Sequence, residues 1–389
     1  MDESNNTLLQ RNARIDVLRG ISIVLVLLHH FNIPYKLHDT LLSVDIGGQS
    51  LITAIARNGN YGVTMFFVIS GFLITSHSLG RWHSLNHLNV RTFYWSRVAR
   101  IVPCLLLLLL IVNSLGLLGL KPFINQAPEG MVVSTAITNL AALTFWMNQL
   151  IIQYGWVNYA LGVLWSLSVE EVFYLVFPLA CLSLKTSRQF ALFLGFFMLA
   201  APVYRWLHFG EDSGAYLYGY LASFDGIAIG CATALLANRI NLDFFQRRMV
   251  QALTIAGMTL FYLYAPIKET STLGITLMAC GTAILILGGL QAKTSLPAQA
   301  VIQSDVLKRG LIKTTISTLG RYSYELYLFH LVILGLIKVA VPPATAIGNQ
   351  KLLLLLVFLA GTVILALVIA RFYSTPLNKW LRQKTKASQ

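Results

Sequence analysis

Ionisable side chains occur inside apolar stretches of this sequence, where each charge costs several kcal/mol and therefore needs a task or a partner. The first such stretch carries Arg19 near its start and His30 near its end, eleven residues later. On a helix this spacing gives about 16 Å of rise and a return to within about 20° of the same face. His29 points about 100° away from that face. An imidazole in the position of His30 can take up and return a proton near neutral pH.

A structural interpretation of the same pair stays open. Arg19 can be a helix-end residue that reaches the lipid headgroups, and His30 can hydrogen-bond a neighbouring helix. In the functional interpretation, Asp16 lies about one turn before Arg19 and is expected to hold its guanidinium in place.

Two adjacent carboxylates, Glu170 and Glu171, interrupt another apolar stretch. Consecutive residues of a helix diverge by about 100°, so only one of the two is expected to share a pocket with a given partner. We expect Glu170 to face that pocket and Glu171 to pair elsewhere. The structural alternative is a hydrogen bond between helices.

Five further residues have weaker patterns. Asp225, Glu325 and His330 lie in apolar stretches and fit a supporting role or a packing contact equally well. Arg97 and Arg100 lie one turn apart just before an apolar stretch and would form one cationic face. Such a face can bind phosphate groups or anionic lipid. The two arginines also fit the rule that basic residues stay on the cytoplasmic side of the membrane, and spacing alone favours this topological explanation.

The elements that must position these groups are transmembrane helices. The chain has 389 residues, of which 56% are hydrophobic and only 11% charged, against about a quarter charged in soluble domains. Long continuous apolar runs, such as 105–120 and 352–370, are typical of helices and not of the short alternating strands of a membrane barrel. The sequence therefore predicts an all-α, polytopic bundle.

Eleven apolar stretches are candidates for crossing the membrane: 17–35, 61–79, 101–119, 135–152, 163–183, 189–204, 215–237, 249–266, 272–290, 316–338 and 351–371. The basic loops fall on one side only if the weakest stretch, 135–152, does not cross. About ten spans with both termini in the cytoplasm follow. Arg205 is assigned to the outer side, and the tail after Pro376 is expected to be frayed.

One membrane domain is expected over 1–389, with no appended soluble domain. The net charge of +14 is explained by the basic loops, so no nucleic-acid partner is expected. The four cysteines have no metal-ligand spacing, and we expect no metal.

Five stretches in this order resemble the membrane-bound acyltransferase-3 family: 14–19 continuing through His30 and Phe31, 62–74, the Arg97/Arg100 pair followed by Pro103, 164–174, and 319–330. The resemblance implies transfer of an acyl group, commonly acetyl from acetyl-CoA, to a hydroxyl of a sugar-containing acceptor. Family acceptors include lipopolysaccharide O-antigen, peptidoglycan, exopolysaccharides and macrolides. It also implies a bacterial inner-membrane location, with the family's Arg-x10-His pattern on Arg19 and His30 and its Arg-x-x-Arg pattern on Arg97 and Arg100.

Two departures from the family pattern are visible. Many members that act on periplasmic polysaccharide carry a C-terminal hydrolase-like domain, which is not expected here. Many also have an arginine beside the aspartate of the seventh span, where this chain has Ser223 and Phe224 before Asp225.

The resulting hypothesis places acyl-CoA phosphates on Arg19, Arg97 and Arg100 and the thioester near His30. His30 acts as the base toward the acceptor hydroxyl, or as the site of an acyl-histidine intermediate, and Glu170 or Glu171 orients its ring. Acceptors in keeping with this chemistry are glycans, glycolipids and glycosylated small molecules. In the loops 36–60 and 120–162, aromatic residues such as Trp156 can stack on a sugar, although an interfacial belt is favoured.

The main alternative is a secondary transporter or proton-coupled carrier, because membrane histidines and carboxylates also serve as proton relays. The chain has no visible two-fold repeat and no matched pair of broken helices. Binding of acetyl-CoA, or hydrolysis of its thioester, would separate the two functions.

Overall fold

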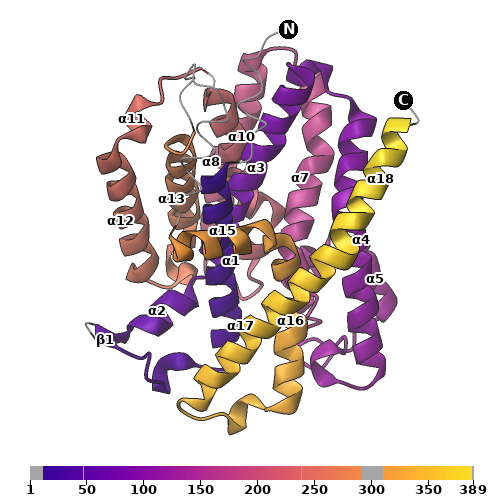
Figure 1. Cartoon of the computed structure of the whole chain (residues 1–389), viewed down its shortest axis with the longest axis vertical. Helices are drawn as coiled ribbons and strands as arrows, with labels where there is room; N and C mark the ends of the chain where they lie inside the picture. Colours follow the sequence, from indigo (N-terminus) through magenta and orange to yellow (C-terminus); the bar gives the residue numbers. More distant parts are fainter. Residues whose placement is uncertain (1–11, 47, 238, 291–309, 388–389) are drawn as a thin grey trace.

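The computed structural model describes residues 12–46, 48–237, 239–290 and 310–387, and the chain over these ranges is a bundle of helices (Figure 1). Nine segments of the described chain are long and apolar enough to cross a membrane: α1 (Ala13–Asn32), α3 (Asn60–Trp82), α4 (Val90–Leu117), α7 (Leu164–Ser183), α8 (Ser187–Leu207), α9 with α10 (Ala215–Tyr218 and Tyr220–Ala237), α13 (Ile267–Leu287), α16 (Ser323–Ala340), and α17 (Gln350–Ile369) with its continuation.

A tenth helix, α12 (Arg248–Tyr264), has 17 residues and runs beside α13 (Figure 1). Its length of about 26 Å is close to the thickness of a bilayer core. The predicted all-α polytopic bundle is thus confirmed, with nine candidate spans in the described chain and α12 just short of that length, and the protein is a multi-pass integral membrane protein.

Shorter elements connect or flank these helices. They are α2 (Leu51–Arg57), α5 (Thr135–Leu143), α6 (Met147–Tyr154), α11 (Asp243–Gln246), α15 (Leu311–Arg321), the 3₁₀ turns η2 (Leu37–Asp39), η3 (Leu85–His87), η4 (Lys121–Phe123) and η5 (Pro343–Thr345), and a two-residue antiparallel pair, β1 (Asp45–Ile46) with β2 (Gln49–Ser50).

The stretch 135–152 does not form a spanning helix. It folds as α5 and α6, of nine and eight residues, separated by a break at Phe145, whose φ of 62° is left-handed. The polar residues that weaken its apolar pattern have partners. Asn139 accepts a hydrogen bond from Asn113, and Asn148 donates to the carbonyl of Tyr218. The prediction that this stretch fails to cross is confirmed.

The predicted span 316–338 is present but begins later than expected, at Ser323. The chain breaks at Tyr322 into α15, which lies across α1 near mid-height in Figure 1, and α16, which continues along the bundle. Close approach of two backbones explains the crossing. A Cβ on Gly20 would lie 2.0 Å from the carbonyl oxygen of Ile316, and one on Gly320 would lie 1.8 Å from that of Asp16. Only glycine allows this contact.

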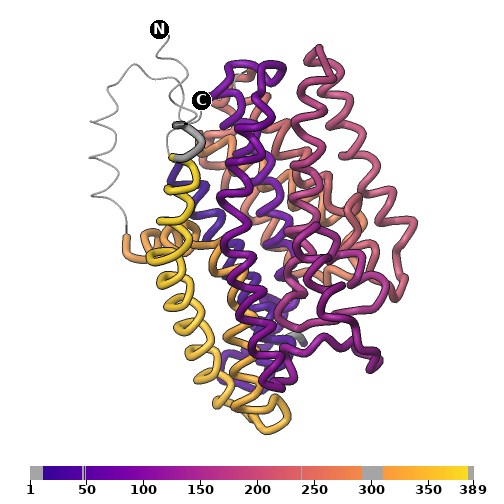
Figure 2. Tube along the Cα trace, turned by 90° about the vertical axis from the view of Figure 1, so that its right-hand side faces the viewer, coloured from indigo at the N-terminus to yellow at the C-terminus, as the bar shows by residue number. Residues whose placement is uncertain are grey.

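The expectation of a frayed tail after Pro376 is also wrong for the described residues. The helix α17 continues through a π-helical turn, η6 (Ala370–Ser374), into α18 (Thr375–Ala387), and Figure 2 shows this segment running along the outside of the bundle. The wider turn accommodates Pro376 without ending the helix. The indole of Trp95 donates to the carbonyl of Leu381 at 3.1 Å and ties α18 to α4.

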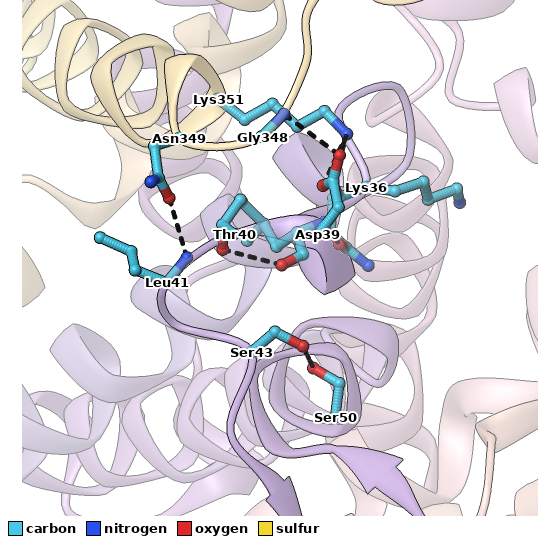
Figure 3. Close-up of polar contacts among 11 residues, drawn as sticks. Lys36, Asp39, Thr40, Leu41, Ser43, Ser50, Gly348, Asn349 and Lys351 are labelled. Carbon is cyan, nitrogen blue, oxygen red and sulfur yellow. Dashed lines mark hydrogen bonds and ion pairs between the residues drawn. The ribbon is translucent and has the colours of Figure 1, made fainter.

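We call the end of the bundle where α1 begins and α18 ends the terminal face. The opposite end, with 33–46, 48–50, 118–163 and 341–349, is the loop face (Figure 1). At the loop face, Lys351 at the start of α17 donates to both oxygens of Asp39 at 2.7 and 2.8 Å and to the carbonyl of Lys36 (Figure 3). Most of the predicted basic loop 291–313 lies outside the described residues. Assignment of the terminal face to the cytoplasm stays a prediction.

Candidate active site

A cavity of about 100 Å³ lies between α1, α3, α4, α7 and α16. Its polar lining consists of Arg19, Ser70, His77, Arg97, Arg100, Ser166, Glu170, Glu171, Tyr174, Ser323, Tyr324 and Tyr327. The site is therefore built from five helices spread over most of the sequence. It contains the three arginines and both glutamates that the sequence singles out.

The three arginines converge on this cavity, as the resemblance implies. The Nε of Arg19 donates to the Ser323 hydroxyl at 3.1 Å, which fixes the guanidinium between α1 and α16. The guanidinium carbon of Arg97 lies 4.7 Å from the centre of the Tyr174 ring. Among the described residues, the buried Nε of Arg97 has no hydrogen-bond partner. Unsatisfied buried donors are rare, so this one is available to a ligand.

Both glutamates line the cavity, although only one was expected to. Glu170 accepts hydrogen bonds from the hydroxyls of Ser70 and Tyr174, the latter at 2.6 Å. Within the described chain, Oε1 of the buried Glu171 has no partner. The expectation fails because the cavity is bordered by α3, α4 and α16 and so covers a wide arc of α7.

His30 lies in a separate cluster. Its ring centre is 4.8 Å from that of His330, 5.4 Å from that of His29 and 6.2 Å from that of Trp156. Its Nδ1 is 2.9 Å from the carbonyl oxygen of Val26. Its neighbour is thus a second histidine where a glutamate was expected.

The difference has a packing origin. Glu170 and Glu171 face the arginines from α7, whereas α16 packs directly on α1 and carries His330 to His30. Sequence spacing gave no sign of this pairing, because the two histidines are 300 residues apart in the chain.

Tyr327 connects the cavity with the histidines. Its ring lines the cavity and lies 5.9 Å from the ring of His330, one turn further along α16. Its hydroxyl is 2.7 Å from that of Ser166 on α7 and 3.2 Å from the carbonyl oxygen of Val163. Tyr327 therefore lies between the arginine-lined cavity and His330 on α16.

Two of the predicted supporting carboxylates join helices. Asp16 lies 3.8 Å from the Nε of Arg321 on α15, and Arg19 makes its own hydrogen bond to Ser323. Glu325 accepts a hydrogen bond of 2.5 Å from Ser374 in η6. These contacts fit the packing alternative left open for Glu325.

Asp225 forms a buried ion pair with Arg205, a residue that the basic-loop pattern assigns to the outer side of the membrane. Arg205 lies within α8, both side chains are fully buried, and their charged atoms are 2.9 Å apart. Arg205 also donates to the carbonyls of Ala222 and Thr272, and Thr276 donates to Asp225 at 2.6 Å. The pair links α8, α10 and α13. Trp206 and Leu207 continue the apolar run beyond Arg205, and this was the available signal.

Residues 12–371 match a family model described as an acyltransferase domain, acyltransferase-3. The chain belongs to the acyltransferase-3 family. Both family patterns of this acyltransferase-3 protein lie within the matched range. They are the Arg19/His30 pair and the Arg97/Arg100 pair. Helix α18 lies beyond it.

Two relatives of this acyltransferase-3 chain are named as O-acetyltransferases. It is 24% identical to the O-acetyltransferase OatA of Staphylococcus aureus strain NCTC 8325 over 386 residues, covering 94% of this chain and 57% of that protein. It is 26% identical to the peptidoglycan O-acetyltransferase OatA of Listeria monocytogenes, covering 94% of this chain and 55% of that protein. The chain thus spans little more than half the length of these relatives. No solved structure gives a significant match.

Proposed function

We propose that this protein is a bacterial inner-membrane O-acyltransferase that moves an acyl group, most simply acetyl, from acyl-CoA to a hydroxyl of a glycan or glycosylated acceptor. One observation carries the proposal. Three arginines surround a cavity on α1, and a histidine suited to act as a base lies eleven residues further along the same helix. Family membership and the names of the relatives support the reaction class.

The arginines bind the phosphates of the donor. Guanidinium groups match phosphate oxygens geometrically and stay charged, and Arg97 has a buried donor still unused within the described chain. The nucleotide stays at the arginines toward the terminal face, while the uncharged pantetheine arm extends past Tyr327 toward His30. The rise from Arg19 to His30 is about 16 Å, within reach of such an arm.

His30 removes the proton from the attacking hydroxyl. Because a carbonyl oxygen only accepts hydrogen bonds, the contact with Val26 requires the proton of the neutral ring to be on Nδ1, which leaves a lone pair on Nε2. The acceptor oxygen attacks the thioester carbon as its proton moves to Nε2, the C–S bond breaks, and the proton passes to the departing thiolate. The products are an O-acyl ester and free CoA.

The glutamates act on the donor side in this scheme. Glu170 holds Ser70 and Tyr174 on the cavity wall, and the Tyr174 ring supports Arg97. In this scheme Glu170 and Glu171 support the donor-binding cavity and do not take the role of orienting the ring of His30 that the sequence had led us to expect.

The acceptor approaches from the loop face. His30 is two residues from the end of α1 at that face and remains partly accessible, and Trp156 lies beside it. An indole gives a flat apolar surface for a sugar ring. With the terminal face in the cytoplasm, the donor enters from the cytoplasm and the acceptor is outside, in keeping with the peptidoglycan acceptor in the name of the Listeria relative.

Purified full-length protein in detergent or nanodiscs, given radiolabelled acetyl-CoA with soluble peptidoglycan fragments, tests the proposal. We expect acetyl transfer, and a loss of about 100-fold or more in kcat for His30→Ala, the typical contribution of a general base. His29→Ala is the matched control, because its Nδ1 bonds the carbonyl of Ala56 instead, and it should change the rate only slightly. Full activity of His30→Ala would refute the mechanism, and failure to bind acetyl-CoA would favour a transporter.

A further inference from the structure

We infer that Arg382 on α18 binds the 3′-phosphate on the ribose of the CoA donor and so forms a second phosphate-binding position beside the arginine-lined cavity. This inference rests on the proposed function, because it presupposes that acyl-CoA is the donor. Helix α18 lies beyond the range that the family model matches, and the family patterns quoted above do not include Arg382.

Two hydrogen bonds hold the C-terminal segment against α4. Near the start of the segment, the hydroxyl of Tyr373 in η6 donates to the carbonyl of Pro103 at 3.2 Å. Near its end, the indole of Trp95 donates to the carbonyl of Leu381 at 3.1 Å. Trp95 lies on the same part of α4 as the cavity arginines, and Leu381 immediately precedes Arg382. These bonds therefore place Arg382 beside the first turns of α4.

Positive charges gather where α18 meets α4. Arg382 experiences the charges of Arg97 and Arg100 on α4 and of Arg81 at the end of α3. All three interactions are repulsive, and within the described chain none of the charged neighbours of Arg382 is a carboxylate. Like charges held close together are unfavourable unless an anion lies among them. The arrangement is therefore suited to an anionic ligand.

The order of the groups along CoA determines which phosphate reaches Arg382. The pantetheine arm is joined to the diphosphate, and the diphosphate is joined to the ribose that carries the 3′-phosphate. Arg97 and Arg100 line the cavity from which the arm extends, so the diphosphate lies at these two residues. Arg382 is exposed and lies outside that lining, toward the terminal face. The outermost phosphate of the donor therefore meets Arg382.

The charge of the 3′-phosphate fits this position. A phosphate monoester carries a charge of about −1.5 to −2 at pH 7, and the guanidinium fork matches its oxygens. Binding it among Arg382, Arg81 and the cavity arginines converts mutual repulsion into attraction. The contact also gives specificity, because an acyl group on the phosphopantetheine of a carrier protein has no 3′-phosphate.

Equilibrium binding of acetyl-CoA and of acetyl-3′-dephospho-CoA to the purified full chain tests the inference. Nanodiscs of phosphatidylcholine are used, so that no anionic lipid competes. We expect the wild type to bind acetyl-CoA about 3- to 10-fold more tightly, a moderate factor because Arg382 is exposed. Arg382→Gln should weaken acetyl-CoA binding by this same factor. Binding of the dephospho donor should stay within about twofold, because residue and phosphate are the two halves of one contact.

Two substitutions are the controls. Arg97→Ala should weaken both donors alike, because both keep the diphosphate. Lys379→Gln removes a positive charge from an exposed position one turn earlier on α18 and should affect neither donor.

Three results would overturn the inference. They are equal binding of the two donors by the wild type, equal weakening of both by Arg382→Gln, and unchanged binding of both by that variant, as expected if Arg382 binds a lipid headgroup. Retained binding of the dephospho donor by Arg382→Gln shows at the same time that the variant is folded. Failure of the wild type to bind either donor would instead reject the proposed function.

Discussion

At the scale of single residues, Arg97 and Arg100 provide the clearest test of donor binding. They lie one turn apart on α4 and line one cavity with Arg19. Removing one hydrogen bond to a charged group costs about 1.5–3 kcal/mol. We expect Arg97→Ala and Arg100→Ala to raise the acetyl-CoA KM about 10- to 100-fold and to lower kcat much less, as measured by steady-state kinetics.

Arg91 is the matched control for this prediction. It lies in the first turn of the same helix, is exposed, and does not line the cavity. Arg91→Ala should leave the KM nearly unchanged. An equal effect of all three substitutions would mean that general surface charge, and not this cavity, attracts the donor.

Residue types and spacing predicted the arginine site well and the histidine site incompletely. The Arg19–His30 alignment is a property of one helix, so the period of the helix is enough to predict it. The partner of His30 belongs to another helix, and no local pattern indicates which helices pack together. His330 was therefore one weak candidate among several.

At the scale of elements, the crossing of α1 and α15 depends on two glycines. A methyl group on Gly320 would lie 1.8 Å from a backbone oxygen of α1, which cannot move independently of its helix. We expect Gly320→Ala to destabilise the protein by at least about 1–3 kcal/mol through overpacking. Thermal unfolding in detergent measures this loss.

Gly257 on α12 gives the matched comparison, since a Cβ there meets nothing within 4 Å. Gly257→Ala should be neutral or slightly stabilising, because alanine loses less backbone entropy on folding. If both alanine variants unfold at the same temperature as the wild type, the close crossing does not contribute to stability.

The buried ion pair between α8 and α10 is a second prediction at this scale. Arg205→Met leaves the Asp225 charge buried without its arginine, and breaking such a pair costs about 3–5 kcal/mol. The double variant Arg205→Met/Asp225→Leu should recover most of this loss, because it buries no charge. Thermal unfolding of both variants measures the difference. If Asp225 is catalytic, the double variant should be stable but should have no transferase activity.

At the scale of the whole molecule, the ion pair between Asp39 and Lys351 ties the first long loop to the start of α17 (Figure 3). Hydrogen bonding from Lys351 lowers the pKa of Asp39 below its ordinary value. A carboxyl group with a lowered pKa stabilises the fold above its unfolded-state pKa, and this contribution disappears as the pH falls through the folded-state pKa.

We therefore expect Asp39→Asn to unfold at a lower temperature than the wild type at pH 7, and the difference to vanish progressively below about pH 4. Unfolding temperatures measured between pH 7 and pH 3 test this. Asp45→Asn, at an exposed position of the same loop, is the control and should show no such pH-dependent difference. A gap that persists at pH 3 would contradict the role of the carboxylate charge.

Orientation in the membrane is the remaining prediction at this scale. The distribution of basic residues among the loops predicts that the terminal face lies in the cytoplasm. A C-terminal green fluorescent protein fusion should fluoresce, and a C-terminal alkaline phosphatase fusion should be inactive. The opposite pair of results would put the donor site on the outer side and exclude the proposed route.

The sequence by itself determined the class of the protein, the failure of 135–152 to cross and the Arg19–His30 alignment. Each of these features depends on local composition or on the period of one helix, and both can be read from residues that are close together in the sequence. Only the tertiary structure decided that α15 lies across α1, that Arg205 is buried against Asp225, and that the buried carboxylates of α7 join the arginines while His330 meets His30. These outcomes depend on how distant helix surfaces fit, through contacts such as those at Gly20 and Gly320, and no spacing along the chain specifies them.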